Sequence, residues 1–326
     1  MKEYRHLFEL FTKHLADYTG ALTGRAPSEL YEPEVYMLSL GGKRLRPLLA
    51  LIGCELFGKD PAAALGSALS AELFHNFSLI HDDILDAAPL RRNKATVHTK
   101  WNTNIAILSG DVMLVKAFQA LSSYDDAQFR QLTTLLQRTA IEVCEGQQQD
   151  MNFEQFTEVS VEEYIRMIEL KTAVLLGCCL QMGAINAGAS EQQQKEIYDF
   201  GRFLGIAFQL NDDHLDAFSK DSAAFGKQPG GDILANKKTY LLTRALELAN
   251  EADRTEIERL LGVSDKQNKI NGMLSIYEKL DVHNLCREEA DRYTQLALAC
   301  LKRIDADAQK KQALQTFALE LLNRQA

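Results

Sequence analysis

The sequence predicts an all-α protein, with residues 1–326 forming a single domain of about ten or more helices packed around one core. None of the six prolines lies between Pro89 and Pro229, and this stretch is rich in Ala, Leu, Gln and Glu, which favour helices. Runs of β-branched residues with strict alternation, which would indicate strands, are almost absent. The chain is 46% hydrophobic and 25% charged, as expected of a globular protein.

Helical periodicity becomes clear after a predicted loop, GKDPAA at 58–63. Apolar residues there recur every three or four positions, at Leu65, Leu69, Leu73, Phe77, Ile80 and Ile84. A second series follows the same spacing, at Ile197, Phe200, Leu204, Phe208 and Leu215. Further loops are predicted at 87–96 and 225–238, and the tail, about 253–326, keeps a helical pattern with charged faces. None of these loops is long or polar enough to be a domain linker.

Composition limits the classes of function. The net charge of −9 argues against nucleic acid as a main partner. No apolar run reaches the roughly 18 residues of a membrane span. The N-terminal MKEYRHLFELF lacks the apolar core of a signal peptide, so a cytoplasmic location is expected. None of the six cysteines has a C-x-x-C spacing, and buried free thiols are expected at 54, 144, 178, 179, 286 and 300.

Two acidic segments, SLIHDDILD and FQLNDDHLD, share the pattern D-D-x-x-D. Their carboxylates are Asp82, Asp83 and Asp86, and Asp212, Asp213 and Asp216. On a helix the first and last of each set lie one above the other, and like charges at that spacing repel. Mg²⁺ would relieve the repulsion, because it takes oxygen ligands and leaves positions for substrate phosphates. A single such motif is usually a solvated acidic face, but two copies after apolar runs favour a metal site. A calcium loop fits poorly, since the required glycine is missing.

Basic residues accompany the acidic segments. LGGKRLRPLLAL places Lys43, Arg44 and Arg46 between a glycine pair and Pro47, which suits a phosphate site at the start of a helix. Basic loops are common, so this stretch alone leaves both interpretations open. Arg91 and Arg92 follow Asp86 by five and six residues, and arginine forks bind phosphate in a bidentate way.

Other candidates are less specific. Lys171 opens a long apolar stretch, where a lysine that extends to solvent is the plain alternative. His75 precedes Asp82 by about two helical turns and could equally be a core histidine. Lys227, Lys237 and Lys238 lie in the Gly/Pro-containing loop after the second motif.

With these residues assembled, the chain strongly resembles the trans-isoprenyl diphosphate synthases, from GGKRLRP to NKKTYLL. The two D-D-x-x-D motifs and the intervening LKTA at 170–173 carry the resemblance. It implies the isoprenoid synthase fold, with helices around a deep central cavity, and a homodimer. It also implies three Mg²⁺ ions per active site, with Mn²⁺ as a substitute.

The resemblance extends to individual positions. Asp82, Asp86 and Asp212 match aspartates that bind Mg²⁺ on the allylic diphosphate, supported by Asp83, Asp213 and Asp216. The isopentenyl diphosphate site corresponds to Lys43, Arg46, His75 and Arg92. Contacts to the allylic diphosphate correspond to Arg91, Lys171, Gln209, Lys227 and Lys237, and Thr172 matches the threonine beside the catalytic lysine. One departure is Asn93, where glycine usually follows the arginine pair. Another is the absence of the two-residue insertion found in the first acidic motif of many bacterial short-chain enzymes.

The reaction that this resemblance implies is head-to-tail prenyl transfer. Phe77, five positions before Asp82, would lie about 7 Å below the metals, with the small Ser78 beside it and Phe74 one turn deeper. An aromatic floor there favours a short product, geranylgeranyl diphosphate first and farnesyl diphosphate next. Alternatives are a longer-chain synthase making thirty- to forty-carbon products, a class I terpene cyclase, or a non-catalytic partner subunit of a synthase. A cyclase would have no use for the second diphosphate site, and a silent subunit should have lost one acidic motif.

Overall fold

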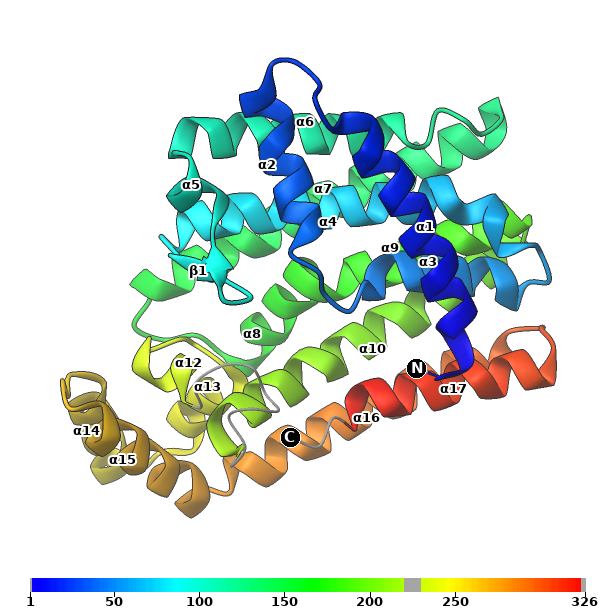
Figure 1. Ribbon diagram of the computed structural model, residues 1–326. Coiled ribbons are helices and arrows are strands. Elements are labelled where there is room, and N and C mark those ends of the chain that lie inside the picture. The colour runs from blue at the N-terminus through cyan, green and yellow to red at the C-terminus, as the bar shows by residue number, and fades with distance from the viewer. Residues whose placement is uncertain (1, 220–229, 324–326) are drawn as a thin grey trace. The chain divides into compact units, whose positions relative to one another are not determined.

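The computed structural model describes residues 2–219 and 230–323, which are almost entirely helical (Figure 1). This confirms the predicted all-α class. The chain separates into two compact units: unit 1 comprises residues 1–138, 178–198 and 304–314, and unit 2 comprises 139–177, 199–303 and 315–326. Four of the five boundaries fall inside helices α7, α9, α10 and α17, and the fifth falls at the end of α16; the bounds of these helices are given below.

Unit 1 is built around α4, an apolar helix that packs against α6 and α3. Glycines allow close helix contact here: a Cβ at Gly53 of α3 would lie 2.3 Å from the carbonyl oxygen of Leu180 in α9. In chain order the elements up to the boundary in α7 are the 3₁₀ turn Lys2–Tyr4, α1 Arg5–Leu22, α2 Ser28–Ser39, α3 Leu45–Leu56, the 3₁₀ turn Pro61–Ala64, α4 Leu65–Leu85, β1 Leu90–Arg91, β2 Lys94–Ala95, α5 Val97–Lys100, α6 Thr103–Gln119 and α7 Asp126–Gln155.

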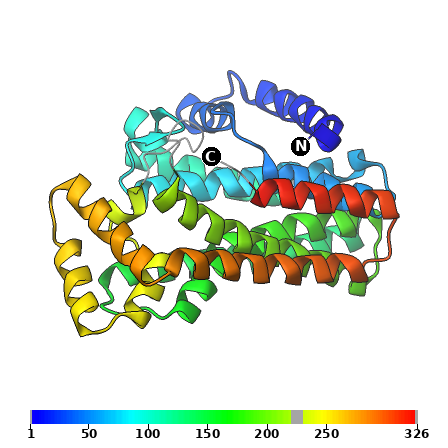
Figure 2. The same ribbon diagram turned by 90° about the horizontal axis from the view of Figure 1, so that it is seen from below.

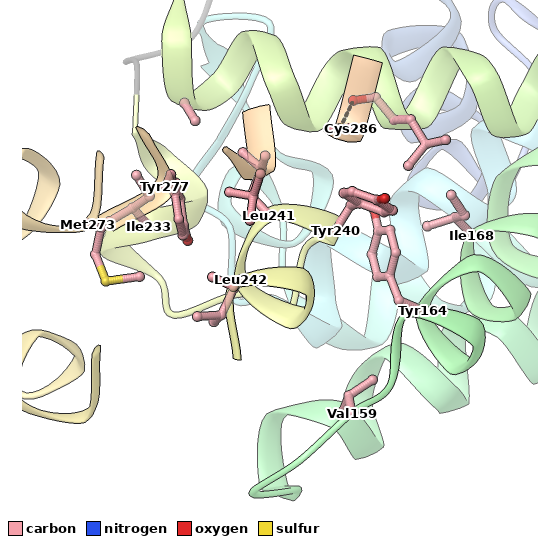
Figure 3. Close-up of a cluster of buried hydrophobic side chains, with 14 of the residues drawn as sticks. Val159, Tyr164, Ile168, Ile233, Tyr240, Leu241, Leu242, Met273, Tyr277 and Cys286 are labelled. Atoms are coloured by element: carbon pink, nitrogen blue, oxygen red, sulfur yellow. Dashed lines mark hydrogen bonds between the residues drawn. The ribbon is translucent and has the colours of Figure 1, made fainter. Parts of the chain in front are cut away.

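Unit 2 has its own hydrophobic core, which Figure 3 shows around Tyr164, Tyr240 and Tyr277. The helices α12 to α15 gather together (Figure 2). Ser160 and Glu163 form a capping box that starts α8. The remaining elements of the chain are α8 Val161–Ile168, a π turn Glu169–Ala173, α9 Val174–Ala187, α10 Glu191–Phe218, α12 Gly231–Leu234, α13 Tyr240–Leu248, α14 Glu251–Leu261, α15 Lys266–Lys279, α16 Val282–Arg303 and α17 Ala308–Leu322.

Two sequence predictions need correction. The segment 87–96 is not only a loop, because it contains the antiparallel hairpin of β1 and β2. Among the cysteines, Cys144 is exposed while the other five are buried, and all six are free. Cys144 lies on α7, a helix with a polar face that the spacing of cysteines could not reveal.

One described stretch, 161–187, is long and apolar enough to cross a membrane by length and composition, although it contains no uninterrupted apolar run of that length. Its mean hydropathy is 1.5, and 78% of the apolar window is buried inside the protein. Core helices of water-soluble proteins have the same character.

Candidate active site

The first acidic motif lies in the last turn of α4, at the helix end where the backbone dipole is negative. Asp82 is half-buried and Asp86 is exposed, one turn apart, while Asp83 is only 2% exposed. Three carboxylates at a negative helix end reinforce one another, so this end of α4 favours bound cations. Aspartate oxygens are the hard donors that Mg²⁺ prefers, and Asp82 and Asp86 therefore fit that ion.

Arg91 holds the middle carboxylate. Its Nε lies 2.9 Å from both oxygens of Asp83, and its Nη2 lies 2.8 Å from Asp83 Oδ1 and 3.7 Å from Asp82 Oδ2. The guanidinium fork is thus bound to Asp83, with Asp82 nearby. The predicted contact of Arg91 with the allylic diphosphate stays a prediction.

The turn after Arg91 has an unusual backbone. Arg91 pairs with Lys94, so Arg92 and Asn93 form a two-residue turn, and both have positive φ, 51° and 60°. Such turns suit the twist of a hairpin, and asparagine adopts this conformation readily. A left-handed arginine is strained, so Arg92 is held there by its surroundings. Asn93 thus replaces the usual glycine without losing the turn.

Arg92 reaches back to the glycine pair before α3. Its Nη1 donates to the carbonyl oxygen of Gly41. A Cβ at Gly42 would lie 2.7 Å from the guanidinium, and Gly42 has φ +121°, so only glycine fits there. Lys43, the next residue, is exposed. The structure therefore brings Arg92 against Gly41 and Gly42, the two residues before Lys43. That Lys43 and Arg92 share a site for isopentenyl diphosphate stays a prediction.

Positive charge gathers around His75. Arg46 Nη1 lies 3.0 Å from His75 Nε2, and Arg46 Nε is buried with no hydrogen-bond partner among the described residues. Burial and the charges of Arg46, Arg92, Arg91 and Arg44 hold the pKa of His75 well below its usual value. A neutral histidine among arginines is the arrangement that a bound anion would stabilise.

Arg44 is fixed within this cluster by Glu72, a residue that the sequence analysis missed. Arg44 donates to the Glu72 carboxylate and to the carbonyl oxygen of Leu38, while Asn76 Nδ2 donates to Glu72 Oε1 at 2.8 Å. Glu72 is buried. The sequence feature that could have indicated Glu72 is its position: a carboxylate inside an apolar helical run, three residues before His75.

The predicted floor residues lie one to two turns before Asp82. Phe74 is fully buried and Phe77 is 9% exposed, with their ring centroids 5.6 Å apart. The ring of His81 packs edge-on against Phe77, with centroids 4.8 Å apart. Ser78 is half-buried and donates to the carbonyl oxygen of His75 at 2.8 Å. Phe77 is thus wedged between two rings rather than free to rotate.

The second acidic motif lies near the end of α10 and is fixed differently. Asp213 is buried and accepts hydrogen bonds from the Tyr164 hydroxyl, from the Tyr240 backbone N–H at 3.1 Å and from Gln209 Nε2 at 3.2 Å. Burial raises the pKa of Asp213 to about 7. Tyr164 and Tyr240 both belong to the hydrophobic core of unit 2, where Figure 3 labels them.

Asp216 is also buried, and its Oδ2 accepts from the backbone N–H of Asp232 at 3.0 Å. Asp212 is only half-buried. The two interior carboxylates of this motif bind protein groups, and Asp212 is the more accessible one. Sequence reasoning identified all three aspartates but not Tyr164 or Tyr240.

Lys171 and Thr172 lie in the π turn between α8 and α9, not at the start of a regular helix as the sequence suggested. Lys171 Nζ is 2.6 Å from Asp150 Oδ2 of α7, another residue that the sequence analysis missed. Thr172 and Gln209 are half-buried. Lys237 is exposed after α12, and its backbone N–H donates to the Asp232 carbonyl oxygen at 3.0 Å. Lys227 lies outside the described residues.

Over the described ranges, no group of three or more His, Cys, Asp or Glu side chains is arranged to hold a metal ion. Each motif turns its middle aspartate toward protein donors, and Asp216 is bound in the same way. The more accessible carboxylates are therefore Asp82 and Asp86 in the first motif and Asp212 in the second. Mg²⁺ commonly binds through one or two carboxylates and takes its other ligands from substrate phosphates and water.

Comparison with known proteins decides the family. The polyprenyl synthetase family model matches residues 27–280. The chain belongs to this family. It is therefore a prenyltransferase of the isoprenyl diphosphate synthase class, which confirms the resemblance stated from the motifs. The chain is also 36% identical over 300 residues to a short chain isoprenyl diphosphate synthase of Methanothermobacter thermautotrophicus, covering 92% of this chain and 91% of that protein.

Other relatives of this polyprenyl synthetase support the same family assignment. A geranylgeranyl diphosphate synthase of Methanosarcina mazei is 39% identical over 229 residues, which is 70% of each chain. A crystal structure of a geranylgeranyl pyrophosphate synthase superposes with a TM-score of 0.93 at 44% identity, covering 99% of both chains. A geranylgeranyl pyrophosphate synthetase from Pyrococcus horikoshii gives a TM-score of 0.91 at 31% identity, covering 98% of this chain and 99% of that one. These likenesses confirm the isoprenoid synthase fold.

Proposed function

We propose that this chain, acting as one catalytic domain over residues 1–326, joins isopentenyl diphosphate head-to-tail to an allylic diphosphate. The products are short-chain all-trans prenyl diphosphates, geranylgeranyl diphosphate first and farnesyl diphosphate second. One observation carries the proposal: a single face of α4 bears His75 in a cluster of arginines and, two turns on, the carboxylates of Asp82 and Asp86. A cationic site and an acidic site about 10 Å apart along one helix suit two diphosphates, one bound directly and one through a metal ion.

Isopentenyl diphosphate would bind to Lys43, Arg46, His75 and Arg92. Arg46 and Arg92 carry permanent positive charge, and arginine forks match phosphate oxygens. The buried Arg46 Nε, which lacks a partner among the described residues, gains one when a phosphate oxygen enters. His75 takes up a proton once the anion offsets the surrounding charges, and it then donates a further hydrogen bond.

The allylic diphosphate would be held by Arg91, Lys171, Gln209, Lys227 and Lys237, and by Mg²⁺ bound to Asp82, Asp86 and Asp212. Three ions are proposed, with Mn²⁺ as a substitute. The metal supplies Lewis-acid neutralisation of the leaving diphosphate. Asp83, Asp213 and Asp216 support the ligands by fixing the two helix ends through Arg91, Tyr164 and the Asp232 N–H.

In the reaction, the allylic carbon–oxygen bond breaks and the diphosphate keeps the electron pair. The terminal double bond of isopentenyl diphosphate attacks the allylic carbocation, forming the new carbon–carbon bond. A proton then leaves the adjacent carbon for the departed diphosphate. Lys171 stabilises charge on the leaving group, and the oxygens of Thr172 and Gln209 stabilise the cation. Apolar walls keep water from the carbocation.

Product length is proposed to depend on Phe77. Its ring is buried and wedged by Phe74 and His81, so an elongating chain would meet a rigid obstacle. Relatives include geranylgeranyl diphosphate synthases and a geranylfarnesyl diphosphate synthase of Aeropyrum pernix at 33% identity, so the family spans more than one length. Phe77→Ala should lengthen the products, read by mass analysis. Unchanged lengths would remove Phe77 from this role.

We also propose a cytoplasmic homodimer, with no nucleic acid partner and no membrane span. Three exposed apolar side chains of α6 support the dimer, because Ile107, Leu108 and Val115 are 40%, 58% and 67% exposed. Light scattering on the purified protein tests it, and Val115→Glu should shift the population toward monomer.

The test of function is direct. Purified protein is incubated with Mg²⁺, radiolabelled isopentenyl diphosphate, and dimethylallyl, geranyl or farnesyl diphosphate in turn. We expect elongated labelled products with each accepted primer, and none when EDTA removes the metal. Release of cyclic hydrocarbon from one diphosphate alone would indicate a cyclase, and no product with any primer would indicate a silent subunit.

A further inference from the structure

Lys171 and Thr172 lie in an interruption of helical geometry. The π turn Glu169–Ala173 separates α8 from α9, which are otherwise regular. A π turn inside an α-helix is rare and often occurs at functional sites, because it redirects the side chains that it carries. What holds this turn in place therefore determines where the ammonium of Lys171 lies.

Two glycines allow neighbouring helices to touch the backbone of the turn. A Cβ at Gly146 of α7 would lie 2.3 Å from the backbone nitrogen of Lys171, and one at Gly205 of α10 would lie 2.6 Å from Ala173 Cα. Real Cβ atoms essentially never approach other atoms so closely. Any larger residue at Gly146 must therefore displace the turn or α7.

The same face of α7 also binds the side chain of Lys171. Gly146 and Asp150 are four residues apart on this helix and so lie one above the other. Asp150 Oδ2 is 2.6 Å from Lys171 Nζ. One turn of α7 thus receives the backbone of Lys171 at Gly146 and its ammonium at Asp150.

The first residue of the turn is fixed as well. Glu169 is half-buried and accepts a hydrogen bond from Arg202 of α10 and another, at 3.0 Å, from Arg166. Arg202 also lies 3.1 Å from Asp199, so its guanidinium is held between two carboxylates. The turn is therefore fixed on three sides, by backbone contact at both glycines and by an ion pair at Glu169.

We propose that Gly146 is a positioning residue for prenyl transfer: by letting α7 touch the backbone of the π turn, it sets where Lys171 presents its ammonium to the leaving diphosphate. Gly205 and the Glu169–Arg202 ion pair also hold the π turn in place. The inference rests on the proposed role of Lys171. A purely structural glycine would affect the free energy of unfolding without affecting kcat in the folded enzyme.

The experiment compares Gly146→Ala with a matched control, Gly53→Ala. In both positions the new Cβ would lie 2.3 Å from a backbone atom of another helix, but Gly53 faces Leu180 rather than the π turn. Each variant is assayed with geranyl diphosphate and isopentenyl diphosphate, and its Tm is measured. We expect Gly146→Ala to lower kcat about 100-fold with little change in KM, since a displacement of about 1 Å has that effect. Gly53→Ala should lower Tm at least as much and kcat less than about threefold.

A double-mutant cycle separates positioning from general damage. In a Lys171→Ala background, Gly146→Ala should lower kcat by less than about threefold, because the group that it positions is already gone. Equal losses in Gly146→Ala and Gly53→Ala, or an undiminished loss in the Lys171→Ala background, would overturn the inference. Wild-type protein without prenyl transfer would instead overturn the proposed function.

Glu169→Gln provides a second test of the same proposal if Gly146→Ala does not fold. It is nearly isosteric and removes only the carboxylate charge, which pairs with both Arg202 and Arg166. We expect about a tenfold loss of kcat that disappears in the Lys171→Ala background. A loss of kcat that persists unchanged in that background, or no loss at all, would contradict the proposal that contacts around the π turn position Lys171.

Discussion

The two D-D-x-x-D motifs share a sequence pattern but are stabilised by opposite means. In α4 the middle aspartate, Asp83, is bound by a charged group, the fork of Arg91. In α10 the corresponding Asp213 is bound by neutral groups, the Tyr164 hydroxyl, the Tyr240 N–H and Gln209. The first arrangement compensates a buried charge with an opposite charge. In the second, burial raises the pKa of Asp213 to about 7, although the three hydrogen bonds that it accepts favour its ionised form.

What the two motifs share is also informative. Each buries its middle residue and leaves an outer carboxylate accessible, Asp82 and Asp86 in one and Asp212 in the other. Buried carboxylates fix the ends of the helices, and accessible ones are available to ligands. A repeated motif therefore contains two kinds of aspartate that the sequence does not distinguish.

The largest expected effect comes from removing an accessible carboxylate. Asp82→Ala and Asp212→Ala should each lower kcat about 1000-fold, because each removes a proposed metal ligand and with it stabilisation of the leaving diphosphate. Their free energies of unfolding should change by about 0.5 kcal/mol or less, as at partly exposed positions. Steady-state kinetics and urea denaturation check both parts. A variant that keeps wild-type kcat would exclude that aspartate from the metal site.

Removing the charge of the buried carboxylates should lower the free energy of unfolding by different amounts in the two motifs. Asp83→Asn leaves the partly buried Arg91 without its partner, and we expect a loss of about 2 kcal/mol. Asp213→Asn keeps an oxygen acceptor for neutral donors and should cost about 1 kcal/mol. Urea denaturation at pH 7 measures both. Equal losses would mean that charge pairing does not distinguish the motifs.

The basic cluster near the first motif should give the protein a pH dependence. His75 is kept neutral in the folded protein by burial and by Arg46 and its neighbours, while in the unfolded chain it takes up a proton near pH 6.5. Its contribution is therefore complete above about pH 6.5, and below that pH the titration of His75 lowers the free energy of unfolding by at most about 1.4 kcal/mol per pH unit. Asp213, whose pKa is raised to about 7, contributes with the opposite sign. His75→Gln should flatten this slope.

Binding of inorganic pyrophosphate provides an independent test of the protonation of His75. Binding near His75 adds negative charge and should raise the histidine's pKa, so that the protein takes up a proton. Calorimetry in two buffers of different ionisation enthalpy measures that proton. Identical heats in both buffers for wild type, or the same uptake in His75→Gln, would contradict the assignment.

The smallest expected effect concerns the hairpin beside the first motif. Asn93 already has the positive φ that glycine would adopt freely. Asn93→Gly should therefore change the free energy of unfolding by about 0.5 kcal/mol or less and leave kcat unchanged. A tenfold change in kcat would show that the asparagine side chain, rather than the turn, matters.

Much of the fold and of the site could be predicted from sequence. Periodic apolar residues predicted the helix at 65–84, because burial of one helical face needs that spacing. The glycine pair and arginines around 41–46 and the two acidic motifs indicated phosphate and metal chemistry, because residue type fixes charge and donor chemistry. The hairpin after α4 was missed, since its strands have only two residues each.

The partners of those residues could not be predicted. Glu72, Asp150 and Tyr164 meet Arg44, Lys171 and Asp213 only through tertiary packing, across sequence separations that no local pattern encodes. The π turn at Lys171 depends likewise on Gly146 and Gly205 in two other helices. The sequence by itself determined the helices and the kinds of charge that this protein carries. Only the tertiary structure decided which carboxylates are buried and which remain accessible, because desolvation depends on neighbours that folding brings together.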